Sequence, residues 1–306
     1  MLEQVSYLYY YRNMSQQEIA RYLHLSKMNV SRLLQKAKDA GIVHTTITLP
    51  FEIDKRLASN LEKKYGLQQA TVVKTDGSMT SNELNEFLGK VAAFYFTTSF
   101  PNNKTYGMGV GETIGKLVAH IPPIYTEKVH VIQLMGGVSA VSEGNPFSII
   151  QSMCEKLGAE GNYLSSYALV KDETLRNNTF VNLEENGFLD LWRNCDEVYL
   201  GIGSIKSENY FLDTLIHDEG AKAAKDSEIA GDLLGHCFNI NGKFLQTAIE
   251  NKLVSIPIDL LASIKKRVAI AGGKEKIEAI AGALKTGLIT HLLTDDKTAS
   301  NILHLT

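Results

Sequence analysis

The stretch MSQQEIARYLHLSKMNVSRLLQKAKDAG, residues 14–41, decides the fold of the first part of the chain. Ser15 stands before a helical pattern and Glu18 follows it by three residues, which is the spacing of a capping box. After a short turn, Ser26 is placed to cap a second helix. The outward positions of that helix are nearly all hydrogen-bond donors: Lys27, Asn29, Ser31, Arg32, Gln35, Lys36 and Lys38. The pattern predicts two helices joined by a tight turn.

Two helices of this kind resemble a helix-turn-helix unit, whose second helix reads the major groove of DNA. The alternative is an ordinary helical hairpin with a solvated basic face. Under the first interpretation, the residues that contact DNA are Ser15, Gln16, Lys27, Met28, Asn29, Ser31, Arg32, Gln35 and Lys36. Gly41 can end the second helix, and the β-branched run at 42–49 predicts a wing of strands. With a supporting helix expected in 1–12, residues 1–50 make a winged helix-turn-helix domain.

Charge is unevenly distributed along the 306 residues, whose net charge is −3. Residues 1–50 hold six basic and three acidic residues, which leaves 25 basic and 31 acidic residues of the totals of 31 and 34. A basic head on an acidic body suits DNA binding by one end of the molecule. A single head of this charge would bind weakly, so we expect a homo-oligomer that binds repeated half-sites.

Signals for membranes, secretion and metals are absent from the sequence. No window approaches the roughly 20 apolar residues of a membrane span, and the first residues lack the basic and apolar regions of a signal peptide. Cys154, Cys195 and Cys237 are far apart and fit neither a disulfide framework nor a zinc site. We therefore expect a cytoplasmic protein with no membrane partner, metal or cofactor.

The rest of the chain has the pattern of an α/β domain. Residues 51–66 predict a linker helix whose apolar stripe fits either docking onto the chain's own body or a helix contact between subunits. From Leu67 onward, short apolar strands alternate with helices and end in glycines, which is typical of a parallel sheet covered on both faces. Residues 67–306 are thus predicted to form a parallel-sheet domain for ligand binding and oligomerisation.

Four of the predicted strands end in glycine turns: Gly107/Gly109/Gly111, Gly136/Gly137, Gly201/Gly203 and Gly272/Gly273. In such sheets the ligand crevice lies at the carboxyl ends of the strands. Glycine lets a backbone N–H approach an anion closely, and the helix that follows points its positive end at the same turn. A phosphate group is therefore the expected ligand. The first turn, GMGVGETIG, matches neither a Walker A loop nor a dinucleotide fingerprint, whose last glycine would fall on Glu112.

The order of these features resembles that of the SorC family of sugar-binding transcriptional regulators over essentially the whole chain. After the head and the linker helix come GMGVGETI, IQLMGG, LGIG, IAGD and AGGKEKIEAIAGALKTGLITHLLTDDKTA. The resemblance implies a Rossmann-like body, related to sugar-phosphate isomerases, that binds a phosphorylated sugar, and a dimer or tetramer. It implies an effector site made of Gly109, Gly111, Glu112, Thr113, Gly136, Gly137, Asn145, Gly203, Asp232 and Lys276. Met135 stands where some members carry a lysine, which excludes an imine to a sugar aldehyde there.

Several of these residues also have simpler interpretations. Asp232 could cap a helix, Asn145 could cap the helix that begins at Pro146, and Lys276 could be a surface lysine. The expected function is a non-enzymatic regulator that binds operator DNA and a phosphorylated sugar. The alternative is a sugar-phosphate isomerase with a DNA-binding head, in which Asp232 and His236 would share a helical face. A constitutive DNA-binding structural protein would leave the large body unexplained.

Overall fold

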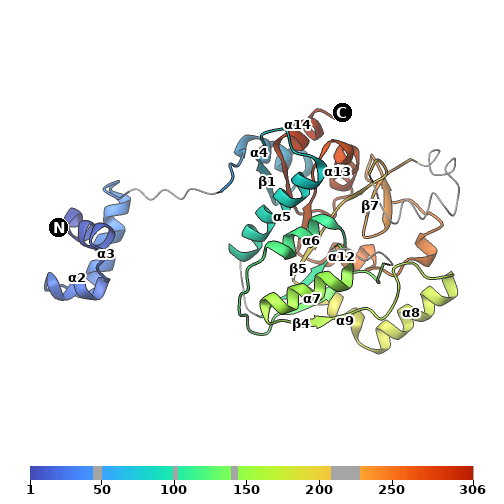
Figure 1. Ribbon diagram of the computed structural model, residues 1–306, viewed down its shortest axis with the longest axis horizontal. Coiled ribbons are helices and arrows are strands. Elements are labelled where there is room, and N and C mark those ends of the chain that lie inside the picture. Colours follow the sequence, from blue (N-terminus) through green and yellow to red (C-terminus); the bar gives the residue numbers. More distant parts are fainter. Residues whose placement is uncertain (44–49, 99–102, 139–143, 208–227, 306) are drawn as a thin grey trace. The chain divides into compact units, whose positions relative to one another are not determined.

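The computed structural model describes residues 1–43, 50–98, 103–138, 144–207 and 228–305 (Figure 1). The chain divides into two compact units, Met1–Pro50 and Phe51–Thr306. Each unit has a hydrophobic core of its own. The core of the smaller unit is built on Val5, Ile19, Ala20, Val30 and Leu34.

The smaller unit, called the head below, contains the predicted helix-turn-helix. Helix α1 (Leu2–Ser6) continues into a π-helical turn, η1 (Tyr7–Tyr11), and is followed by α2 (Gln16–Tyr22) and α3 (Lys27–Asp39). Ser15 and Glu18 form both bonds of the capping box, and the Ser26 hydroxyl accepts the Asn29 N–H at 3.2 Å. The two helices and their caps are therefore confirmed. Most of the predicted wing, residues 44–49, lies outside the described residues.

The larger unit, called the body below, is built on a parallel sheet of seven strands. Their spatial order is β1 (Gln69–Val73), β10 (His291–Asp295), β9 (Lys266–Ile270), β5 (Glu197–Leu200), β2 (Thr105–Met108), β3 (His130–Gln133) and β4 (Glu160–Asn162). Three of the four residues of β2 and of β3, and all of β5, are buried, as expected for strands covered on both faces.

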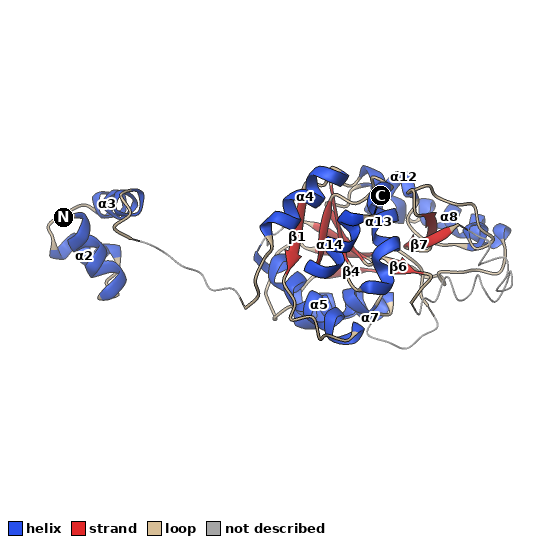
Figure 2. Cartoon of the chain, turned by 90° about the horizontal axis from the view of Figure 1, so that it is seen from above, coloured by secondary structure: helices blue, strands red, loops and turns tan. Residues whose placement is uncertain are grey.

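Helices cover the sheet on both sides (Figure 2). Three of them connect strands that advance toward β4, namely α5 (Ser81–Thr98), α6 (Glu112–His120) and α7 (Pro146–Leu157). The chain then returns across the sheet, and right-handed connections put the later helices on the opposite face. That face carries α9 (Phe188–Arg193), α12 (Ile258–Ser263), α13 (Ile277–Lys285) and α14 (Asp296–His304), while α8 (Glu173–Glu185) packs beside α9.

A small antiparallel sheet is inserted between β5 and α12. It consists of β6 (Gly203–Ser204), β7 (Ile229–Leu233) and β8 (His236–Asn239), and β7 packs against α13. Leu233 pairs with His236, so Leu234 and Gly235 form a two-residue hairpin loop, and both have positive φ, 53° and 87°. The helix considered for this segment is therefore wrong, and with it the interpretation of Asp232 as a helix cap.

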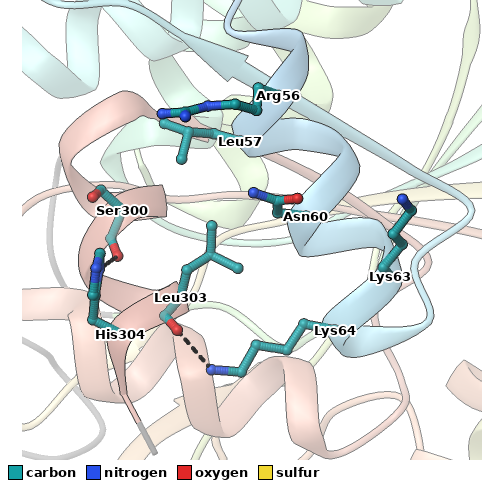
Figure 3. Close-up of a pocket in the computed structure, with 8 residues that line it drawn as sticks. All are labelled: Arg56, Leu57, Asn60, Lys63, Lys64, Ser300, Leu303 and His304. Carbon is teal, nitrogen blue, oxygen red and sulfur yellow. Dashed lines mark hydrogen bonds between the residues drawn. The ribbon is translucent and has the colours of Figure 1, made fainter.

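The predicted linker helix is α4 (Lys55–Tyr65), and it packs on β1 and α14 of the chain's own body. Leu61 is fully buried in that contact. The Lys64 ammonium donates to the carbonyls of Leu303 at 3.0 Å and Leu305 at 2.7 Å, at the carboxyl end of α14. An open groove of about 620 Å³ runs between the two helices, lined by Arg56, Leu57, Asn60, Lys63, Lys64, Ser300, Leu303 and His304 (Figure 3).

A buried carboxylate holds the amino ends of three strands together. Glu197, the first residue of β5, forms ion pairs with Lys104, just before β2, and with Lys266 of β9, the latter at 2.8 Å. The Tyr199 hydroxyl also donates to it, at 3.1 Å. Burial favours a raised pKa for Glu197, but the hydrogen bonds and charges of the two lysines together outweigh it and lower the pKa.

We expect Glu197→Gln to destabilise the body by about 2 kcal/mol at neutral pH, because it leaves two partly buried ammonium groups without their anion. Because the folded-state pKa is lowered, the stabilisation is present above the unfolded-state pKa of about 4.3 and disappears as pH falls through the folded value. Urea unfolding at several pH values measures this difference. Glu52→Gln, at the exposed ion pair with Lys74, is the control and should change stability little.

Close backbone packing makes glycine necessary at position 136. A Cβ added to Gly136 would lie 2.4 Å from the carbonyl carbon of Tyr167, whereas one added to Gly137 would meet its nearest atom at 3.8 Å. We expect Gly136→Ala to cost about 2 kcal/mol or more of unfolding free energy, because backbone has to move. Gly137→Ala should stay within about 0.5 kcal/mol of the parent. Equal stabilities of the two variants in urea unfolding would contradict the packing described.

Candidate functional site

The four glycine turns lie next to one another at the carboxyl edge of the sheet, because β9, β5, β2 and β3 are successive neighbours. The connections after β2 and β5 leave in opposite directions, which makes the boundary between these strands a switch point of the topology. At that point the N–H of Gly109 donates to the carbonyl of Tyr199 at 2.8 Å. A Cβ on Gly109 would lie 3.1 Å from the backbone of Leu200, so the two turns are in close contact.

The amino end of α6 is directed at this edge. Its N-cap is Gly111, with φ of 115°, and this residue has no side chain to accept the N–H groups of the first turn. Glu112 is exposed at the first position of the helix. Thr113 is buried, and its hydroxyl donates to the side-chain oxygen of Asn85 on α5 at 3.0 Å. The predicted hydroxyl donor is therefore engaged with the protein, while the helix end keeps its positive character.

Three charged residues from distant parts of the chain gather beside α6. They are Glu112, Asp232 of the small sheet, and Lys276 at the end of the 3₁₀ helix η3 (Lys274–Lys276). Burial lowers the pKa of the Lys276 ammonium, and the negative charges of Asp232 and Glu112 oppose that shift. Lys276 is thus a partly buried cation under the influence of two carboxylates rather than a solvated surface lysine.

Asp232 is held rigidly in this cluster. It is buried, and its Oδ2 accepts the N–H of Gly235 in the hairpin loop at 2.8 Å. Gly203 pairs with Asp232 across the small sheet. The hydroxyl of Ser204 donates to the carbonyl of Glu275 at 2.7 Å, which ties the small sheet to η3. The hairpin and the 3₁₀ turn therefore fix the separation of the carboxylate and the ammonium.

Like Gly109 and Thr113, other predicted effector residues use polar groups within the protein. The N–H of Gly111 donates to the carbonyl of Gly144 at 3.1 Å. The N–H of Gly136 donates to the carbonyl of Val254, and that of Gly137 to the carbonyl of Ser166, at 2.9 and 2.8 Å. Asn145 caps α7: its side-chain oxygen accepts the N–H of Phe147 at 3.0 Å. Of the two interpretations of Asn145, the structure supports the helix cap.

The histidine required by the isomerase alternative is not available as a base. His236 is buried, with Nδ1 2.9 Å from Glu250 and Nε2 3.0 Å from the carbonyl of Ile256. Both ring nitrogens are thus engaged, and the residue lies on β8 rather than on a helix with Asp232. Within the described ranges no three His, Cys, Asp or Glu side chains are grouped to hold a metal ion, and no helix there is long and apolar enough to span a membrane.

A pocket of about 590 Å³ lies at the same edge of the sheet, beside η3 and the ends of β10 and β1. Its polar lining includes Thr75, Lys274, Lys297 and Thr298. None of these four residues belongs to the predicted effector site. The polar segment after the last predicted strand, Thr294-Asp295-Asp296-Lys297-Thr298, could have indicated them.

The second helix of the head presents its predicted DNA-contacting side chains to solvent. Lys27, Met28, Asn29, Ser31 and Arg32 are all exposed on α3. The other predicted contacts also lie at the surface, but two are engaged: Ser15 in the capping box, and Gln35 as a donor to Asp39 at 2.9 Å. Gln16 is half-buried and Lys36 is exposed. Lys27, Arg32 and Lys36 are therefore exposed cations on α3.

Known proteins match the chain over both units. Residues 49–304 match the family described as "Putative sugar-binding domain", and residues 3–40 match "Sigma-70, region 4". The chain is 27% identical to the deoxyribonucleoside regulator of Bacillus subtilis, over 95% of this chain and 93% of that relative. It is 28% identical to the transcriptional regulator LsrR of Escherichia coli, over 98% of this chain and 93% of that relative.

The crystal structure of the full-length sorbitol operon regulator SorC from Klebsiella pneumoniae has the same architecture. Its TM-score is 0.74 at 26% sequence identity, covering 99% of this chain and 97% of that chain. The family match spans more than half of the present sequence and includes all seven strands of the parallel sheet. A helix-turn-helix precedes it, as the sequence predicts. The chain therefore belongs to the SorC family of sugar-binding transcriptional regulators.

Proposed function

We propose that this regulator controls a carbohydrate-utilisation operon in the cytoplasm, and that a phosphorylated sugar bound to the body controls its affinity for operator DNA. The observation that carries the proposal is the gathering of Lys276, Asp232 and the amino end of α6 at the switch point of the sheet. We propose no enzymatic activity, because the isomerase alternative needs Asp232 and His236 on one helical face, whereas they lie on β7 and β8 and His236 is engaged through both ring nitrogens.

The charges of the cluster favour one orientation of such a ligand. Glu112 and Asp232 together outnumber Lys276, so an anion is repelled unless it lies toward the first-turn N–H groups of α6. The phosphate would therefore bind at the amino end of α6 and beside the Lys276 ammonium. The carboxylates would accept hydrogen bonds from the sugar hydroxyls. Two relatives are named for sorbitol and for deoxyribonucleosides, and we extend that broad class of carbohydrate compounds to this chain.

Control of DNA binding requires that the ligand have different affinities for two arrangements of the oligomer. The body supplies the ligand site and, we propose, the contacts that hold subunits together, as a dimer or tetramer. The head, residues 1–50, supplies helix α3, which is proposed to read the groove. In the sequence, the body follows from Phe51, and α4 is its first helix. A change in subunit arrangement would then alter the spacing of two heads relative to two half-sites.

Arg32→Ala should weaken operator binding about tenfold or more, because a bidentate contact to a base contributes roughly 1–3 kcal/mol of discrimination. The measurement is fluorescence anisotropy with duplexes that the parent protein selects from a random pool. Arg12→Ala removes the same charge from an exposed site of the head outside α3 and is the matched control. If the two variants bind equally well, α3 does not read the groove.

Lys276→Met should abolish the response to a phosphorylated sugar. The measurement is thermal shift against pentose, hexose, polyol and triose phosphates, each beside its unphosphorylated parent. A ligand at 100 times its dissociation constant adds about 2.7 kcal/mol to the unfolding free energy. Lys285→Met, at an exposed position in the last turn of α13, removes the same charge away from the site and should keep the response. Equal shifts from a phosphate and its parent sugar would contradict the phosphate assignment.

A further inference from the structure

The π-helical turn of the head exposes a group of aromatic side chains. Tyr7, Tyr10 and Tyr11, called the tyrosine face below, are 52, 42 and 72% exposed. The rings of Tyr7 and Tyr11 stack with centroids 5.0 Å apart and planes 20° from parallel. The opposite side of the same helical segment, with Val5 and Leu8, packs into the core of the head. The described part of the head does not cover the tyrosine face.

The segment Tyr7–Tyr11 is unusual in its helical geometry as well as in the exposure of its tyrosines. A π-helical turn is rare and is found most often at functional sites. Isolated exposed apolar residues are common, but adjacent aromatic rings on one turn are the kind of surface found at protein interfaces. The head has a core of only a few side chains. A domain of this size buries little of its surface and gains stability from any further contact that covers its rings.

The tyrosine face lacks the charge of a DNA-binding surface. Glu3 is the one charged side chain in residues 1–11, and the basic residues of the head begin at Arg12. Protein surfaces that bind DNA are strongly positive because they neutralise phosphates. The cations of α3 meet that need, and the tyrosine face does not. An uncharged aromatic surface suits contact with an identical copy, because like charges do not oppose each other across the symmetry axis.

We infer that the tyrosine face is the surface through which two heads of one oligomer pair when they occupy two half-sites. The inference rests on the proposed function, since it assumes DNA-bound heads. Each copy would present Tyr7, Tyr10 and Tyr11 to the same residues of the other copy, in an isologous contact. Tyrosine suits such a contact, because its ring packs and its hydroxyl finds water or a polar partner at the rim.

The size of the surface indicates how strong this pairing is. Tyrosine side chains bury 150–250 Å² each, so three half-exposed rings offer roughly 300 Å² per head. That area is well below the roughly 800 Å² per partner of a stable interface. Free heads would therefore stay apart, whereas heads tethered to one oligomer have an effective concentration in the millimolar range. The pairing would thus act only in the full-length oligomer.

Cysteine cross-linking of the full-length protein tests the location of the contact. Tyr11→Cys introduces an exposed thiol on the tyrosine face, and Tyr22→Cys introduces one at an equally exposed tyrosine on α2. Burial raises the pKa of the Cys154 thiol to about 11 and that of Cys195 to about 12. Cys195 and Cys237 are buried and Cys154 is half-buried, and the parent protein treated with the same reagent gives the background.

A short bismaleimide should give covalent dimers with Tyr11→Cys but not with Tyr22→Cys, and the yield should not change on tenfold dilution. Fast labelling of residue 11 by a monomaleimide without dimers would show that the face stays in solvent. Slow labelling without dimers would show that another part of the chain covers it. Both labelling reactions are run with a duplex of two half-sites bound, so either result overturns the inference, whereas failure of the parent protein to bind that duplex would overturn the proposed function instead.

DNA binding supplies the second measurement. The double variant Tyr7→Ser/Tyr11→Ser should bind a duplex with two half-sites at least tenfold more weakly than the parent. Its affinity for a duplex with one half-site should be unchanged, because α3 is intact. Equal losses on both duplexes, or no loss on either, would overturn the inference. Failure of the parent protein to bind any duplex would instead overturn the proposed function.

Discussion

Close approach of backbone at the carboxyl edge of the parallel sheet is the constraint on which the candidate site depends. Gly109 brings the end of β2 against the end of β5, and Gly136 brings the end of β3 against Tyr167. Gly144 in turn packs against the first residues of α6, where a Cβ would lie 2.7 Å from the carbonyl carbon of Gly111. These contacts leave no room for side chains, so backbone and helix ends form the floor of the edge.

The charged clusters at the amino edge and at the carboxyl edge of the sheet differ in how their charges are paired. At the amino edge, Glu197 is satisfied by Lys104, Lys266 and Tyr199, and this cluster joins three strands. At the carboxyl edge, the Lys276 ammonium lies within the electrostatic influence of Asp232 and Glu112, beside a helix end that no side chain of the described ranges caps. In the first cluster the Glu197 carboxylate has three partners, and the loss of this anion would leave two ammonium groups unpaired. Under the proposed function, the amino end of α6 and the Lys276 ammonium would attract the phosphate, and the carboxylate oxygens would accept hydrogen bonds from sugar hydroxyls.

The chain has two units with separate hydrophobic cores, and the proposed DNA-binding and ligand-binding surfaces lie on different units. The head depends on local interactions, a capping box and a short apolar stripe, and places its cations on one helix. The body buries a large core around a parallel sheet. Such a division allows the ligand and the DNA to be bound by different surfaces, and under the proposed function the coupling between them comes from the arrangement of subunits.

Local patterns in the sequence determined the helix-turn-helix, the alternation of strands and helices, and the glycine-ended strands, because caps, periodicity and turns involve residues a few positions apart. The same patterns misplaced Asp232, since four-residue spacing fits a helix, whereas a Leu234-Gly235 hairpin loop decides the segment. Tertiary structure alone decided that the Thr113 hydroxyl binds Asn85, 28 residues away, and that Lys276 meets Asp232 and Glu112. Contacts of such long sequence separation depend on how elements pack, and no local pattern encodes them.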